Sequence, residues 1–312
     1  MSAQTTLRLD RLSLKNFRCF TECVLDLHPE LTVLVASNGQ GKTALLDAIA
    51  ILLGLFVDSF KETKHAFGFA RADAHLTSRG GDTMEPVVPV VLSVEGWARG
   101  HKIAWRHKIV ALGKEKSVLV RSEAGDLQSL AHGLRGLLEH TAKNPDDGVP
   151  LLPVVAYYGT GRLWSEHHLT QAKRRGEATV KGRLAGYRDC LSPPSSFKVF
   201  ADWYGETWRS MGAPRVPGLE VPDRPERLIA AVESAVKTVL EPTGWHGLEY
   251  VNGHLFVRHA EHGRLLLSLL SDGVRNMIAL VADLAQKCVR LNPHLGDEAT
   301  QKTPGVVLID EV

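Results

Sequence analysis

The residue types and spacing of a phosphate-binding loop occur near the N-terminus, in Ala36-Ser37-Asn38-Gly39-Gln40-Gly41-Lys42-Thr43. The pattern GxxxxGK[ST] is matched at every fixed position except the first, where an alanine replaces glycine. Glycines let backbone N–H groups converge on phosphate oxygens, and the N-terminus of the following helix adds its positive dipole end. The lysine of the pattern binds the β- and γ-phosphates and its last hydroxyl ligates Mg²⁺. We therefore expect ATP and Mg²⁺ to be bound by Asn38, Gly39, Gln40, Gly41, Lys42 and Thr43.

An acidic pair, Asp310-Glu311, follows a short apolar run at the other end of the chain. A buried strand that ends in two carboxylates is the Walker B arrangement, which accompanies a phosphate loop. Asp310 is expected to hold the Mg²⁺, and Glu311 is the expected catalytic residue, because it can orient or deprotonate the attacking water. Lys42 is the second expected catalytic residue, through its charge on the transferred phosphate.

A third candidate lies at Ser271-Asp272-Gly273, just before an amphipathic segment. The simpler interpretation is a helix start, with Ser271 as N-cap. The functional interpretation, which we favour, is an ABC-type signature, whose serine and glycine bind the γ-phosphate of a nucleotide held by a second protomer.

The elements around these residues follow from hydrophobic patterning. Leu31–Ala36 is apolar and rich in β-branched residues, which predicts a strand buried on both faces, and 44–56 has the length and composition of a buried helix. Strand, loop and helix in this order form the first half of a βαβ unit. Other expected strands and turns are at 7–14, 23–27, 151–158 and 305–309, in an antiparallel meander at about 87–120 and in a hairpin at Asn252-Gly253, with helices at 127–143, 196–211, 224–240 and 272–291.

Composition excludes several classes of protein. The chain has 312 residues, of which 44% are hydrophobic and 23% charged, as in folded globular proteins rather than disordered ones. Its 37 Lys and Arg against 35 Asp and Glu give a net charge of +2, so a nucleic acid could be contacted only through a local patch. No secretory signal or membrane span is evident, and a cytoplasmic protein is expected.

One such patch is the basic stretch at 162–188. A solvated surface is its default interpretation, and a contact with DNA or with a partner nuclease is the alternative. Its charges come from Arg162, Lys173, Arg174, Arg175, Lys181, Arg183 and Arg188 against Glu166 and Glu177.

Together with Leu14-Lys15-Asn16-Phe17-Arg18-Cys19-Phe20, these motifs resemble the ABC-type ATPases of the SMC/RecF/OLD group. The strings Val154-Val155-Ala156-Tyr157-Tyr158-Gly159-Thr160-Gly161-Arg162-Leu163-Trp164 and Thr303-Pro304-Gly305 are similar, more narrowly, to compact AAA-type ATPases of retron and Septu (PtuA-like) anti-phage systems. The resemblance implies an α/β fold, a P-loop NTPase of the ABC-type head class with an inserted antiparallel β subdomain and a helical arm. It also implies ATP-driven dimerisation through the nucleotide site, a partner nuclease of the HNH type, and no membrane.

The expected division places an ATPase core in 1–56 and 245–312, a β-rich continuation in 57–160 and a helical arm in 161–244. Two departures from the family pattern stand out: no glutamine occupies a Q-loop strand, and the sequence ends before a D-loop and switch histidine, so we expect a truncated product in which hydrolysis is in doubt.

Two other functions are kept beside the ATPase: a nucleotide-sensing regulatory or scaffold subunit with little turnover, and a RecF-like DNA-repair ATPase. A phosphotransferase or GTPase is disfavoured, because no NKxD guanine-reading motif is present.

Overall fold

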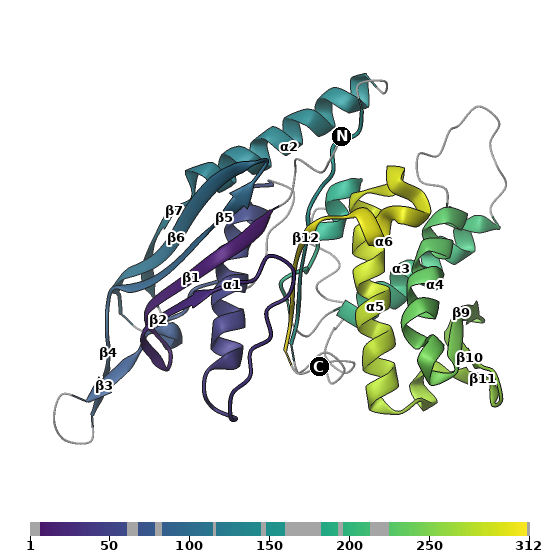
Figure 1. Ribbon diagram of the computed structural model, residues 1–312, viewed down its shortest axis with the longest axis horizontal. Helices are drawn as coiled ribbons and strands as arrows, with labels where there is room; N and C mark the ends of the chain where they lie inside the picture. The colour runs from purple at the N-terminus through teal and green to yellow at the C-terminus, as the bar shows by residue number, and fades with distance from the viewer. Residues whose placement is uncertain are drawn as a thin grey trace. The chain divides into compact units, whose positions relative to one another are not determined.

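A computed structural model describes residues 7–60, 68–78, 83–114, 117–144, 148–159, 182–192, 196–212 and 225–310 (Figure 1). The chain divides into two compact units. The first comprises 1–157 and 304–312, so it joins both chain ends, and the second comprises 158–303.

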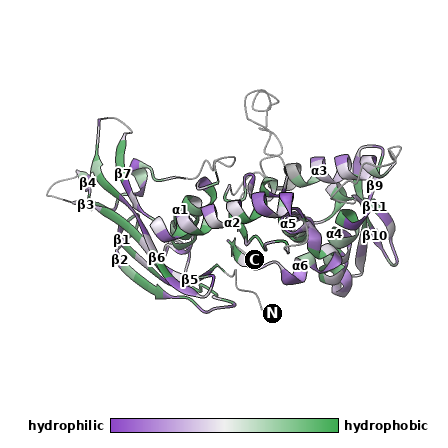
Figure 2. Cartoon of the chain, turned by 90° about the horizontal axis from the view of Figure 1, so that it is seen from above, coloured by the Kyte–Doolittle hydropathy of each residue, from purple (hydrophilic) through white to green (hydrophobic). Residues whose placement is uncertain are grey.

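The first unit contains a five-stranded antiparallel sheet of order β2-β1-β5-β6-β7. Its strands carry both hydrophobic and hydrophilic residues (Figure 2), and in β5 the buried positions recur at every second residue. The expected meander is therefore present, and it continues the sheet of the N-terminal hairpin instead of forming a sheet of its own. The strands are β1 Arg8–Phe17, β2 Phe20–Asp26, β5 Val90–Ala98, β6 His101–Leu112 and β7 Val118–Glu123.

Helix α1, Lys42–Asp58, lies between this sheet and a pair of strands, β8 Val154–Tyr158 and β12 Gly305–Ile309 (Figure 1). Because it is covered on both sides, almost every residue from Ala44 to Val57 is buried, as the apolar composition predicts. The β8–β12 pair is tight: the Val154 N–H donates to Pro304 O at 2.7 Å, and a Cβ on Gly305 would lie 1.9 Å from Val154 O. Only glycine fits there, and this close approach brings β12 against β8.

Helix α2, Gly125–Lys143, packs on β6 and α1. A small antiparallel pair, β3 Leu76–Ser78 and β4 Met84–Pro86, follows the short 3₁₀ helix η1, Arg71–Asp73.

In the second unit, three helices pack with a three-stranded antiparallel sheet of order β11-β10-β9. The predicted hairpin is present, with Asn252 and Gly253 both at positive φ, as a two-residue turn of this kind requires. The helices are α3 Ser196–Met211, α4 Pro225–Leu240 and α5 Asp272–Leu291; the strands are β9 Trp245–Val251, β10 His254–His259 and β11 Gly263–Leu266; and the short helices are η5 Arg183–Tyr187, η6 Glu241–Thr243, η7 Leu267–Leu269, η8 Pro293–Glu298 and α6 Ala299–Lys302.

Two expectations differ from the structure. Leu31–Ala36 forms no strand, and Leu31, Val33 and Val35 are 72%, 70% and 89% exposed. A strand buried on both faces needs hydrogen-bonded neighbours, and no described strand pairs with this segment. Residues 245–303, expected in the core with the N-terminal part, pack instead with α3 and α4, because Leu248, Val257 and Ile278 share one hydrophobic core with those helices.

Among the described residues, no helix combines the length and the hydropathy needed to cross a bilayer.

Candidate nucleotide-binding site

The candidate phosphate loop leads directly into α1. Gly39 and Gly41 have φ of 80° and 86°, which only glycine adopts without strain, and Gly41 is the N-cap of the helix. A Cβ on Gly39 would touch nothing within 4 Å, so this part of the loop is open to a ligand. Ala36 is not among the described residues with positive φ, which explains why its methyl group is tolerated.

Lys42 extends back over the loop. Its Nζ donates to the carbonyl oxygens of Ala36 at 2.7 Å and Ser37 at 3.1 Å. The ammonium therefore lies over the residues that would surround a phosphate, with donors that could turn to phosphate oxygens. Asn38 and Gln40 are exposed on the same loop.

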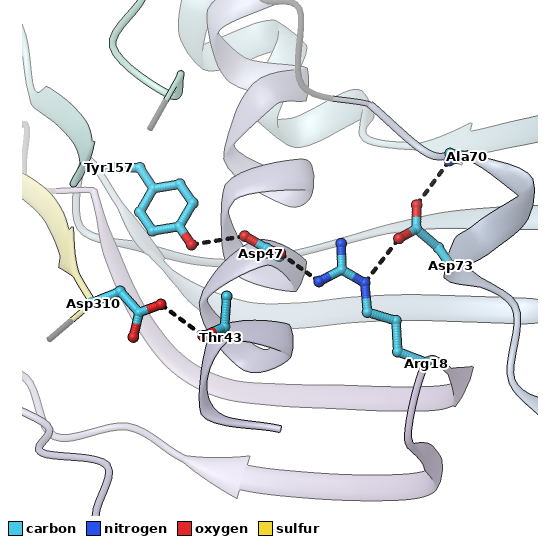
Figure 3. A network of polar contacts seen from close by, with 7 residues as sticks. All are labelled: Arg18, Thr43, Asp47, Ala70, Asp73, Tyr157 and Asp310. Atoms are coloured by element: carbon cyan, nitrogen blue, oxygen red, sulfur yellow. Dashed lines mark hydrogen bonds and ion pairs between the residues drawn. The ribbon is translucent and has the colours of Figure 1, made fainter. Parts of the chain in front are cut away.

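Thr43 and Asp310 are in direct contact. The Thr43 Oγ1 donates to Asp310 Oδ2 at 2.6 Å, although 267 positions separate the two residues in the sequence (Figure 3). The hydroxyl comes from the first turn of α1 and the carboxylate from the residue that follows β12. Thr43 is exposed, whereas Asp310 is only 5% exposed, so the carboxylate is held in place and the hydroxyl remains reachable.

This pair of oxygens fits Mg²⁺. Magnesium takes oxygen ligands in an octahedron and is commonly held by one or two protein groups together with phosphate oxygens and waters. A hydroxyl and a carboxylate beside a phosphate loop supply that set. No group of three or more His, Cys, Asp or Glu side chains that could hold a metal alone occurs in the described part of the chain.

A buried polar network lies one helical turn further along α1 (Figure 3). The Tyr157 hydroxyl, from β8, donates to Asp47 Oδ1 at 2.7 Å, and Arg18 pairs with Asp47 Oδ2. The Arg18 Nε also donates to Asp73 Oδ1 at 2.9 Å. Burial, the hydrogen bond to Asp47 and its charge raise the pKa of Tyr157 far above its usual range, so the hydroxyl keeps its proton and remains a donor.

Sequence reasoning missed this network, although one signal pointed to it. Asp47 is the only charged residue between Thr43 and Asp58 in α1, and a lone carboxylate in a buried helix requires partners.

The candidate signature residues belong to the second unit. Ser271, Asp272 and Gly273 are exposed at the N-terminus of α5 in the second unit, where Ser271 makes no side-chain capping bond and Asp272 accepts from Arg275 at 2.8 Å. Glu311 lies outside the described residues, as does most of the basic stretch at 162–188. From that stretch, Arg183 donates to Leu291 O at 2.6 Å and to Asn292 Oδ1 at 3.0 Å, which is a structural role.

A family model described as an AAA domain matches residues 11–193, which is more than half of the chain. The chain belongs to this family. The predicted fold class, a P-loop NTPase of the ABC-type head class, is confirmed, as is the relation to SMC/RecF-like and retron ATPases.

Two named proteins and one solved structure are similar to this chain. A protein of Vibrio cholerae named "Retron Vc95 probable ATPase" is 21% identical over an alignment that includes 98% of this chain and 64% of that protein. The DNA replication and repair protein RecF of Staphylococcus carnosus is 46% identical over 46 residues, which are 15% of this chain and 12% of RecF. The SMC head domain from Thermotoga maritima aligns with 97% of this chain and 89% of that domain, at 15% identity and a TM-score of 0.41. The chain thus spans less than two thirds of the length of the retron protein and of RecF.

Proposed function

We propose that this chain is a cytoplasmic ATPase subunit that binds Mg·ATP at residues 38–43, dimerises on ATP, hydrolyses it and controls a partner nuclease or DNA-processing effector in anti-phage defence. One observation carries the nucleotide site: the hydrogen bond between Thr43 Oγ1 and Asp310 Oδ2, 2.6 Å long, which joins the helix after the phosphate loop to the end of β12. Those are the two places from which a P-loop NTPase holds its Mg²⁺.

In this proposal, different residues of the chain bind the phosphates, hold the metal and act on the attacking water. Backbone N–H groups of the loop and the Lys42 ammonium bind the phosphates, and Thr43 and Asp310 hold the Mg²⁺, which neutralises charge as the γ-phosphate leaves. Glu311 follows Asp310 directly and acts on the attacking water.

We propose that two copies of the chain dimerise when Ser271-Asp272-Gly273 of one copy contacts the nucleotide bound to the other. All three residues are exposed at the N-terminus of a 20-residue helix, so a nucleotide bound to another copy can reach the helix dipole and the free N–H groups. Support for a defence role comes from the retron relative, whose alignment includes 98% of this chain. The partner, an HNH-type nuclease by resemblance, and any DNA contact through 162–188 belong to the same proposal.

Replacement of Glu311 by glutamine tests whether this chain hydrolyses ATP. We expect wild type to turn over ATP, and Glu311→Gln to lose about 100-fold or more of that rate, because a general base typically contributes 10²–10⁴-fold. Glu311→Gln should still bind ATP and accumulate as a dimer. Phosphate release and light scattering with and without ATP measure both quantities. The control is Glu298→Gln, which removes an exposed carboxylate that pairs with the exposed Lys302.

A different outcome would select a different function. If neither wild type nor Glu311→Gln hydrolyses ATP and both dimerise with it, the chain is a nucleotide-sensing regulatory or scaffold subunit. A RecF-like repair ATPase remains the second candidate, favoured by the 46% local identity to RecF; turnover stimulated by DNA alone, without a partner nuclease, would support it.

A further inference from the structure

Helix α1 carries the candidate metal ligand Thr43 in its first turn, so the rotation of this helix about its axis determines where the Thr43 hydroxyl points. Apolar packing defines that rotation poorly. From Ala44 to Val57 the helix is apolar around its whole circumference except for Asp47, and a helix with similar side chains on every face can rotate with little change in buried apolar area. A polar group with fixed partners can select one rotation.

Asp47 is that group. It lies four residues after Thr43, which places both side chains on the same face of α1. Asp47 is 7% exposed, and both of its carboxylate oxygens are engaged, Oδ1 by Tyr157 and Oδ2 by Arg18. The two α1 side chains therefore contact neighbouring strands one turn apart: Asp47 contacts a residue of β8, and Thr43 contacts the residue after β12.

The partners of Asp47 are themselves fixed. Arg18 is held by Asp73 through its Nε at 2.9 Å and through its backbone N–H, which donates to Asp73 O at 2.8 Å. Asp73 is 5% exposed, and its second carboxylate oxygen accepts from the Ala70 N–H at 2.8 Å. The turn that carries Arg18 also packs on the phosphate loop itself, since a Cβ on Gly41 would lie 2.6 Å from Cys19 Sγ and 2.7 Å from the Phe20 ring.

We propose that Asp47 fixes the rotation of α1 so that Thr43 meets Asp310 and the metal, and that Arg18 and Tyr157 are positioning residues that act through Asp47. This inference rests on the proposed function, because it concerns the Mg²⁺ site of that same nucleotide. The loop's backbone and Lys42 bind phosphate without this network, so the network governs the metal-dependent part of binding.

The test measures the affinity for a fluorescent ATP analogue twice, in EDTA and in Mg²⁺; the ratio of the two affinities is the magnesium gain. We expect Tyr157→Phe and Asp47→Leu to keep the EDTA affinity within about twofold and to reduce the magnesium gain about tenfold, the order of one lost hydrogen bond to a charged group. Asp47→Leu also makes the segment from Ala44 to Val57 wholly apolar, and circular dichroism checks that the variant folds. Asp47→Asn is the milder second variant.

Two comparisons separate positioning from a loss of stability. Tyr204→Phe is the matched control, because it removes a hydroxyl that donates to Glu233 at 2.8 Å, again from a buried tyrosine to a carboxylate, in the second unit. Its magnesium gain should equal that of wild type. If Tyr157 acts through Asp47, adding Tyr157→Phe to Asp47→Leu should reduce the gain no further.

An unchanged magnesium gain in both single variants, or additive losses in the double variant, would overturn the inference while leaving the proposed function intact. A wild type that binds no nucleotide in either condition would overturn both.

Discussion

Replacement of Lys287 by methionine is expected to lower the free energy of unfolding by about 3 kcal/mol or more. Lys287 Nζ lies 2.5 Å from Asp283 Oδ2, and the two side chains are 7% and 0% exposed. Tyr158 also donates to this oxygen, at 2.8 Å, whereas Asp283 Oδ1 has no hydrogen-bond partner among the described residues. Removal of the ammonium would leave a buried carboxylate with one tyrosine donor, and that desolvation cost dominates the effect.

Urea denaturation, followed by circular dichroism, measures this loss. The matched control is Lys302→Met, which breaks a pair of the same i,i+4 spacing, Lys302–Glu298, with side chains 55% and 58% exposed. Exposed pairs of this kind contribute roughly 0.5 kcal/mol or less. The combined Asp283→Leu and Lys287→Met variant should recover most of the stability, because no buried charge is left. A loss below about 1 kcal/mol in Lys287→Met would contradict the account of this pair.

Replacement of Lys42 by alanine is expected to weaken ATP binding by about 100-fold or more. The ammonium is the one charged donor that the phosphate loop carries, and hydrogen bonds to charged groups contribute about 1.5–3 kcal/mol each, so the loss of contacts to two phosphates corresponds to this factor. Isothermal titration calorimetry with ATP measures the affinity directly.

The control for Lys42→Ala is Lys102→Ala, on β6 of the same unit. Lys102 makes an exposed ion pair with Glu95 at 2.9 Å, so its replacement removes the same charge from the surface and should leave ATP affinity unchanged. Retention of wild-type affinity by Lys42→Ala would remove the basis for every nucleotide function considered for this chain.

The site could be predicted from the sequence where its chemistry is local. Phosphate binding needs glycine, lysine and threonine at fixed short spacings, and these are visible in eight consecutive residues. The buried helix after the loop and the strand before Asp310 also follow from composition. The proximity of Thr43 and Asp310 could be predicted from the chemistry of Mg²⁺, which needs a carboxylate opposite the hydroxyl. The structure places the two side chains in contact. Their roles as metal ligands remain a prediction.

What could not be predicted depends on contacts between distant residues. The role of Asp47 depends on its contacts with Arg18 and Tyr157, which lie 29 and 110 positions away in the sequence. No local sequence pattern predicts contacts of this kind. Leu31–Ala36 has the composition of a buried strand, but a strand forms only where another strand supplies hydrogen bonds, and composition carries no information about that neighbour. The same limit explains why 245–303 were expected in the core: their periodicity shows an apolar face but does not show which helices cover it.

The most direct test of the central claim is a crystal structure of the chain with Mg²⁺ and a non-hydrolysable ATP analogue. The account predicts phosphates surrounded by residues 38–43, and a Mg²⁺ at about 2.1 Å from Thr43 Oγ1 that contacts Asp310 directly or through one water. Phosphates bound elsewhere, or a metal beyond the reach of one bridging water from Asp310, would contradict it.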